Sequence, residues 1–176
     1  MKQHESIAGA APAGQVAGAS GADEASRQYL SFFLGGQEYA TDILKVQEIK
    51  GWDTVTRVPH SPNYILGVIN LRGAIVPVID PRVLFALESA PFDSATVVIV
   101  VRVAGARGER IVGLVVDAVS DVYGFTAGNI QPPPDAVGTI EQMFVLGLAK
   151  LEDRLVIILD IERLVISSVL GDSRAA

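Results

Sequence analysis

The chain has 176 residues, of which 14 are Lys or Arg and 20 are Asp or Glu, so its formal net charge is −6. Hydrophobic residues make up 49% of the sequence, enough for the core of one folded unit or of two small ones. Cysteine is absent, which excludes disulfides, thiolate zinc sites and thiol nucleophiles. The two histidines, His4 and His60, leave little imidazole for catalysis. The acidic balance argues against nucleic-acid and anionic-membrane surfaces, because both require concentrated positive charge.

The first 26 residues differ in composition from the rest. They are rich in Ala, Gly and Ser, so they bury too little apolar area to offset the entropy lost on ordering, and we expect a disordered tail over 1–26. No apolar stretch follows Lys2 as a signal peptide requires. The apolar runs at 97–101 and 155–159 are much shorter than the roughly 18 residues of a membrane-spanning helix. We therefore expect a soluble, cytoplasmic protein without membrane insertion.

From residue 27 onward, short runs of Val, Ile and Leu alternate with Gly, Pro, Asn and Asp, which is typical of β-strands. The pair Gly35 and Gly36 predicts a tight turn between strands at 29–34 and 37–42. Short helices are expected where an Asp can accept backbone N–H bonds as an N-cap. These helices are expected at 42–46, 80–86 and 160–166, and further strands at 56–58, 68–71, 74–79, 96–104, 110–116, 142–150 and 154–159.

The sequence contains an internal repeat. Residues 64–80 align without a gap with 144–160 at an offset of 80, and a second block, 46–59, aligns with 119–132 at an offset of 73. The change of offset places about seven extra residues at 132–138. The repeat predicts two small barrels or a pseudo-twofold sandwich, divided near 86–95. Because each half is close to the size at which a lone core becomes marginal, we expect the two to pack together or exchange elements as one cooperative unit.

The sequence lacks the motifs of common catalytic sites, including GxSxG, HExxH, the Walker loop and GxGxxG. The carboxylates of Asp117 and Asp121, or of Asp80 and Asp160, are available for acid–base chemistry, but helix capping explains the second pair. We therefore expect no enzyme activity, no metal and no cofactor.

Binding of a partner remains as the candidate function, and the motif Asn-Leu-Arg-Gly at 70–73 is the strongest local candidate for a binding site. The aligned residues at 150–153 are Lys-Leu-Glu-Asp, so the scaffold position is repeated while its polar identity is not. An Arg beside a Gly on an exposed turn can offer its donors to a partner, and Glu48 is the acid that we expect to pair with Arg72. The alternative is a surface ion pair of about 0 to 1 kcal/mol without a function.

Several blocks resemble the CheW family of bacterial chemotaxis coupling proteins. They are the segments at 39–49, 56–59, 67–80, 112–122 and 153–162, and they follow the family's order and spacing between about 28 and 169. Pro81 stands where the family usually has another residue, which suits the first turn of a helix.

The resemblance implies an all-β fold of two five-stranded, SH3-like β-barrels with a few short helices. The barrels would span about 27–90 and 91–169, with exchange of elements between them allowed, followed by a C-terminal tail at 170–176. It also implies a non-catalytic adaptor at membrane-associated receptor arrays, which couples methyl-accepting chemoreceptors to the histidine kinase CheA. By position, the resemblance implies a kinase or scaffold interface at Gly67 and Gly147 and a receptor-binding surface at Val46, Glu48, Asn70, Arg72, Val97, Gly113 and Val119.

Two alternatives stay open at this point. One is an adaptor of the same fold for a non-flagellar chemosensory pathway that governs twitching or gene expression. The other is a small β-barrel enzyme or ligand-binding protein, which would require a large, closed, polar-lined pocket.

Overall fold

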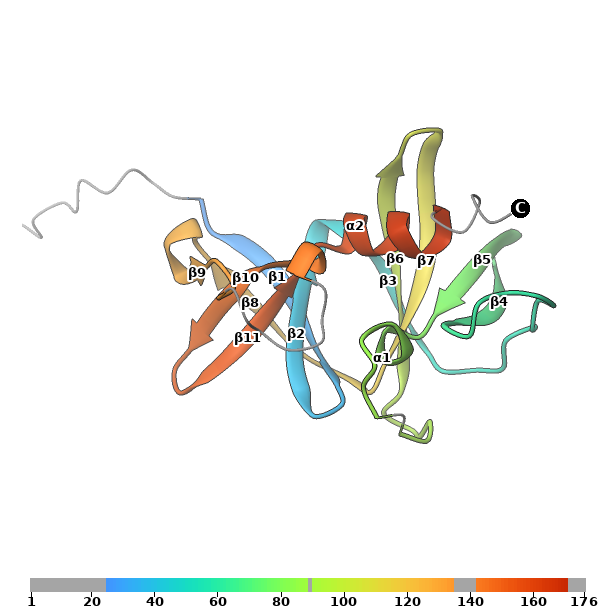
Figure 1. Ribbon diagram of the computed structural model, residues 1–176, viewed down its shortest axis with the longest axis horizontal. Helices are drawn as coiled ribbons and strands as arrows, with labels where there is room; N and C mark the ends of the chain where they lie inside the picture. Colours follow the sequence, from blue (N-terminus) through green and yellow to red (C-terminus); the bar gives the residue numbers. More distant parts are fainter. Residues whose placement is uncertain (1–24, 89, 135–141, 171–176) are drawn as a thin grey trace, which may run out of the picture.

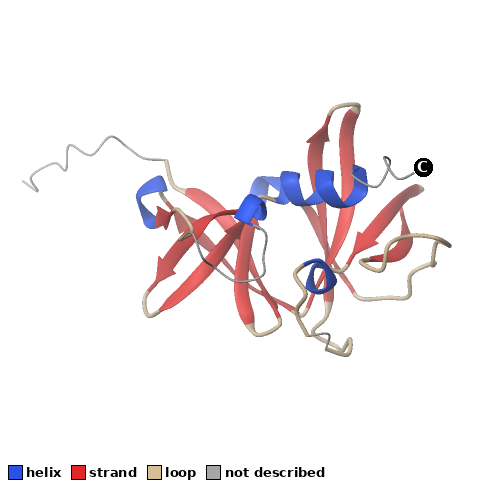
Figure 2. Ribbon diagram, in the orientation of Figure 1, coloured by secondary structure: helices blue, strands red, loops and turns tan. Residues whose placement is uncertain are grey.

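A computed structural model describes residues 25–88, 90–134 and 142–170. The expected tails at 1–26 and 170–176 therefore lie outside the described residues, except for residues 25, 26 and 170. Strands dominate the described chain and helices are short (Figure 2), which confirms the expected all-β class. Within the same three ranges, no helix has the length and apolar character needed to cross a bilayer.

The strands form two sheets that lie side by side (Figure 1). The six-stranded unit has the order β8-β1-β2-β11-β10-β9 and contains β1 (Arg27–Leu34), β2 (Gln37–Asp42), β8 (Ala118–Phe125), β9 (Ile130–Gln131), β10 (Val145–Leu151) and β11 (Arg154–Leu159). The five-stranded unit has the order β3-β6-β7-β5-β4 and contains β3 (Val46–Gly51), β4 (Ile65–Leu71), β5 (Ala74–Ile79), β6 (Val97–Gly105) and β7 (Gly108–Val116). Short helices connect them: η1 (Ile43–Lys45), α1 (Pro81–Leu84), η2 (Ala127–Asn129), η3 (Gln142–Phe144), α2 (Ile161–Val165) and the π-helical η4 (Ile166–Leu170).

The two units repeat one topology with exchanged hairpins. Strands β3, β4 and β5 hold the places in one sheet that β8, β10 and β11 hold in the other. The hairpin β6–β7 completes the first set and the N-terminal hairpin β1–β2 completes the second. The expected division near 86–95 therefore does not separate the sheets, because that segment connects strands of the same five-stranded unit.

Neither sheet is a barrel closed by continuous strand pairing. The edges are β3 and β4 in one unit and β8 and β9 in the other. In the five-stranded unit the segment after β3 meets β4 at an isolated bridge, where the backbone groups of Thr56 and Val68 exchange hydrogen bonds of 2.9 and 2.8 Å. In the six-stranded unit β9 pairs with β10, opposing Gln131 to Leu148. Because Thr56 and Gln131 are 75 positions apart rather than 73, part of the expected insertion precedes residue 132.

Some expected elements differ from those observed. Only Thr56 of the expected strand at 56–58 makes a bridge, and the expected strand at 142–150 begins as the helical turn η3. The edge strands β3 and β8 were not among the expected strands, although the repeat aligned them with each other. Asp80 and Asp160 do cap α1 and α2, accepting N–H bonds from Arg82 at 3.0 Å and Arg163 at 3.1 Å, so the capping prediction is confirmed.

The largest apolar cluster joins the two units. It combines Phe32 and Tyr39 of the six-stranded unit with Ile99 and Leu114 of the five-stranded unit, all nearly inaccessible to solvent. Leu164 of α2 belongs to the same cluster, and this helix runs between the units in Figure 1. A smaller cluster fills the interior of each unit. Separating the units would expose their shared core to water, which is unfavourable.

A buried guanidinium also bridges the units. Arg82, whose side chain is 2% exposed, binds Asp80 through two contacts of 3.0 Å and donates through Nη1 to Asp117 Oδ1 and Ala90 O, both at 3.0 Å. The second oxygen of Asp117 accepts the N–H of Gly35, in the turn between β1 and β2, at 2.8 Å. The hydrogen bond to Asp80 raises the pKa of Arg82 against the opposing effect of desolvation. Arg82 therefore stays charged and connects both units.

We expect Arg82→Met to lower the free energy of unfolding by about 3 kcal/mol, because it leaves the carboxylate of Asp80 buried without its cation. Urea denaturation followed by far-UV circular dichroism measures this loss. The matched control is Arg163→Met, which removes a 66% exposed side chain at 3.6 Å from Asp160 and should cost less than about 1 kcal/mol. Equal losses in the two variants would contradict a special role of the buried pair.

Candidate functional site

An exposed ion pair connects the two edges of the five-stranded unit. Arg72 Nη2 lies 2.8 Å from Glu48 Oε2, with side chains 78% and 22% exposed. Glu48 belongs to the edge strand β3, and Arg72 follows β4, the opposite edge. The expected pairing of these two residues is confirmed, and it spans a gap between strands that are not neighbours in the sheet.

The turn that carries Arg72 is held by its own side chains and backbone. Asn70 Oδ1 accepts the N–H of Gly73 at 2.8 Å, and both central residues have positive φ, 53° at Arg72 and 90° at Gly73. A positive φ is uncommon for a residue with a side chain, so the glycine and the asparagine bond define how the arginine is presented. The repeat position Glu152 also has a φ of 53°, which shows that the backbone is repeated while the charge is reversed.

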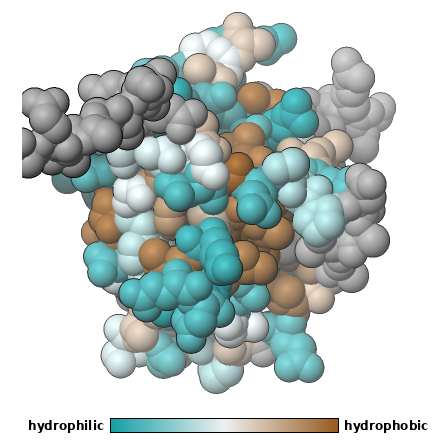
Figure 3. Space-filling model, turned by 90° about the vertical axis from the view of Figure 1, so that its left-hand side faces the viewer, coloured by the Kyte–Doolittle hydropathy of each residue, from teal (hydrophilic) through white to brown (hydrophobic). Residues whose placement is uncertain are grey.

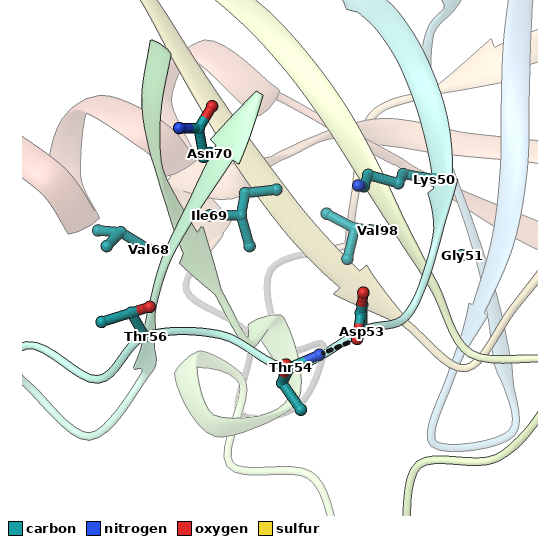
Figure 4. A pocket seen from close by; sticks show the side chains of 9 residues that line it. All are labelled: Lys50, Gly51, Asp53, Thr54, Thr56, Val68, Ile69, Asn70 and Val98. Atoms are coloured by element: carbon teal, nitrogen blue, oxygen red, sulfur yellow. Dashed lines mark hydrogen bonds between the residues drawn. The ribbon is translucent and has the colours of Figure 1, made fainter. Parts of the chain in front are cut away.

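A small open pocket lies beside this turn, between β3 and β4. Figure 4 shows Lys50 and Val98 on one side and Ile69 and Asn70 on the other, with Asp53 near the lower end. Its volume of about 160 Å³ is below the roughly 300 to 1,000 Å³ usual for small-molecule sites. The described residues contain no cluster of three or more His, Asp or Glu that could hold a metal ion. The geometry therefore suits a side chain of a partner protein better than a cofactor.

The three valines implied by the resemblance lie at the junction of the units. Val46, Val97 and Val119 are half-buried and pack against the shared core. Val46 pairs with Val101 and Val97 with Gly51, so these two valines occupy opposite ends of the β3–β6 pair. Val119 lies on β8 in the other unit. The structure therefore distributes the valines along the junction instead of gathering them beside the Glu48–Arg72 pair.

Gly113 is an interior residue. It lies on β7, opposite Val78 and Val100, and is buried. A Cβ atom at this position would lie 2.7 Å from Val98 Cγ1. Gly113 therefore lets neighbouring strands pack closely, and the structure does not bring it to the surface.

Gly67 and Gly147 lie where each unit is closed. A Cβ atom on Gly67 would lie 2.3 Å from Thr56 O, and one on Gly147 would lie 2.6 Å from Gln131 O. Both glycines are buried and sit at equivalent irregularities in strand register. Both positions require glycine because the backbone of the closing segment approaches the strand too closely to leave room for a side chain.

Reasoning from the sequence missed the contact between Arg82 and Asp117 at the junction of the units. Asp117 was considered only with Asp121, but it binds Arg82 and Gly35, whereas Asp121 accepts a hydrogen bond from the neighbouring N–H of Val122. A weak signal exists at 80–82, where Asp-Pro-Arg places a cation next to a capping carboxylate. Nothing in the sequence pairs that cation with a residue 35 positions away.

Substitution of Gly67 by Ala should lower the free energy of unfolding by about 1 to 3 kcal/mol, because the backbone at Thr56 must move away from the new methyl group. Gly51→Ala is the control, since no atom lies within 4 Å of its added Cβ. Chemical denaturation of both variants measures the difference. If Gly67→Ala proved as stable as Gly51→Ala, the close approach would not limit this position.

Comparison with known proteins identifies relatives of this chain. A family model described as CheW-like domain matches residues 28–168. The chemotaxis protein CheW of Klebsiella aerogenes is 46% identical over 161 residues, which cover 92% of each chain. That of Bacillus subtilis is 35% identical over 129 residues, covering 73% of this chain and 80% of its own.

A solved structure shows the same fold. The crystal structure of the scaffolding protein TtCheW from Thermoanaerobacter tengcongensis matches with a TM-score of 0.72 and 35% identity, covering 80% of this chain and 88% of that chain. The expected SH3-like β fold is thus confirmed, with two sheets in place of closed barrels. With one domain model spanning both sheets and relatives aligned over most of their length, the chain belongs to the CheW-like family of chemotaxis proteins.

Proposed function

We propose that this chain is a non-catalytic scaffold that couples the cytoplasmic tips of methyl-accepting chemoreceptors to the histidine kinase CheA. Membership of the CheW-like family supports a scaffold in chemotaxis. The observation that carries the proposal is the exposed Arg72, presented on a turn held by Asn70 and paired with Glu48 across an open sheet edge. Such an arrangement offers oriented donors to a protein partner.

The receptor surface combines polar and apolar parts. A receptor tip is a helical hairpin, and helices bind by laying an apolar face on a groove while a polar rim sets their orientation. In this chain the half-buried Val46, Val97 and Val119 supply apolar contacts along the junction. Glu48, with Arg72 beside it, supplies the rim. Gly113 contributes indirectly, by allowing β7 to pack closely against its neighbours.

The kinase is expected to use a different face, because a coupling protein must hold both partners at once. Gly67 and Gly147 affect this interface through the closing segments that they accommodate. Figure 3 views the end of the molecule that carries β9, β10 and β11, where apolar side chains lie at the surface among polar ones. On these elements and the adjoining η3, Met143, Leu146 and Leu155 are each about half exposed, as is common where proteins bind one another.

We expect Arg72→Glu to weaken binding of a receptor hairpin fragment by about tenfold, or about 1.4 kcal/mol. The substitution places a second carboxylate beside Glu48 and removes the donors of the guanidinium. Receptor-dependent stimulation of the kinase should fall in parallel. Titration calorimetry and a phosphorylation assay with reconstituted partners measure the two effects.

The charge-swapped double variant, Arg72→Glu with Glu48→Arg, should restore part of the binding, since it rebuilds the pair in the opposite direction. Arg107→Glu is the control for the charge change, because Arg107 is exposed in the turn between β6 and β7 and is not a member of the Glu48–Arg72 pair. Normal stimulation by a folded Arg72→Glu protein would exclude this turn from the receptor surface.

A further inference from the structure

Asp117 lies where the chain passes from the five-stranded unit to the six-stranded unit. It is the one residue between β7, which ends at Val116 in the five-stranded unit, and β8, which begins at Ala118 in the six-stranded unit. Its backbone N–H donates to Phe33 O at 2.9 Å, and its side chain is 26% exposed. The chain thus crosses between the units at a single, anchored residue.

The two oxygens of the Asp117 carboxylate bind different units. Oδ1 accepts from Arg82 of the five-stranded unit at 3.0 Å, and Oδ2 accepts from Gly35 of the six-stranded unit at 2.8 Å. A carboxylate can accept on both oxygens at once, and the contact with a buried guanidinium is charge-assisted. The side chain therefore clamps the turn between β1 and β2 to helix α1.

The clamp is continuous with β3 through aromatic contacts. The Phe92 ring lies 5.0 Å from the Arg82 guanidinium carbon and 4.2 Å from the ring of Trp52. Trp52 directly follows β3 and donates its backbone N–H to Thr96 O at 3.1 Å. Packed side chains therefore connect the end of β3, the strand of Glu48, with the start of β8, the strand of Val119.

The other crossing between the units is held by a more exposed contact. There β2 leads through η1 to β3, and Lys45 of η1 pairs with Glu162 of α2, with side chains 35% and 38% exposed. Ion pairs in contact with water are weak and screened by salt. The buried clamp is therefore the stronger restraint on how the two units are oriented.

We propose that Asp117 is a positioning residue that sets the relative orientation of the two β units and thereby transmits receptor state to the kinase. The inference rests on the proposed coupling function and goes beyond it, because it assigns the transmission step to a residue outside the candidate binding surfaces. Transmission between two sites needs an element whose geometry both sites bias. The Asp117 crossing is the point at which a displacement of one unit must act on the other.

The first test measures orientation in the full-length chain without partners. Because the sequence has no cysteine, Ala106→Cys and Lys150→Cys introduce two unique spin-label sites, one in each unit. Asp117→Asn should broaden their distance distribution by about twofold, since an NH2 group replaces one of the two acceptor oxygens and would face the donor of either Arg82 or Gly35. The control is Asp153→Asn, an equal charge change in the exposed turn between β10 and β11, which should leave the distribution unchanged.

The second test measures coupling. Asp117→Asn should bind a receptor hairpin fragment or the CheA regulatory domain alone within about twofold of the wild type, yet stimulate the kinase at least about fivefold less when both are present. A purely structural defect would instead weaken binding together with stimulation. If Asp117→Asn does not fold, Arg82→Lys serves in its place, because its single ammonium group cannot span Asp80, Ala90 and Asp117 as the guanidinium fork does.

The two tests together separate the proposal for Asp117 from the proposed coupling function. A broadened distribution together with lost stimulation and retained binding supports the proposal. An unchanged distribution, or a broadened one with normal stimulation, overturns it. A wild-type chain that fails to stimulate the kinase at all overturns the coupling function itself, while the spin-label measurement still judges the clamp.

Discussion

The buried Arg82 is the interaction on which the arrangement of the two units depends. Removing a guanidinium from water costs several kcal/mol, and this cost is offset only when its donors meet well-placed acceptors. Here Asp80, Asp117 and the carbonyl of Ala90 supply them, all at 3.0 Å. Because any rotation of one unit against the other would lengthen a contact of a buried charge, the network favours a single orientation.

The exchanged hairpins couple the orientation of the two units to the packing of their shared core. Each unit contains strands from both halves of the chain, and the largest apolar cluster draws on both sheets and on α2. A unit therefore cannot move independently without disturbing the shared core. A duplicated fold built in this way can hold two partners on different faces and still behave as one mechanical body.

The sequence predicted the central features of the fold because they depend on local pattern. Apolar runs located the inner strands, and Asp80 and Asp160 marked two helix starts. The edge strands β3 and β8 escaped prediction. Strand β3, for example, reads Val-Gln-Glu-Ile-Lys-Gly, and its partly exposed residues form no apolar run. The hairpin exchange and the contact between Arg82 and Asp117 depend on which distant segments meet. The pairing of Glu48 with Arg72 was instead predicted from the tendency of an arginine on an exposed turn to bind a carboxylate.

Divergence of the repeat gives the two similar units different surfaces, as the proposed coupling function requires. Arg72 and Glu152 occupy equivalent turns of the two units and have the same φ of 53°. The residue aligned with Glu48 is Asp121, which is exposed. One unit therefore presents an arginine beside an acid, while the other presents two carboxylates at the corresponding positions. A partner surface that complements the first meets excess negative charge on the second, and such mismatches separate partners more effectively than added attraction does. Backbone duplication supplies two similar faces, and charge at a few turn and edge positions distinguishes them.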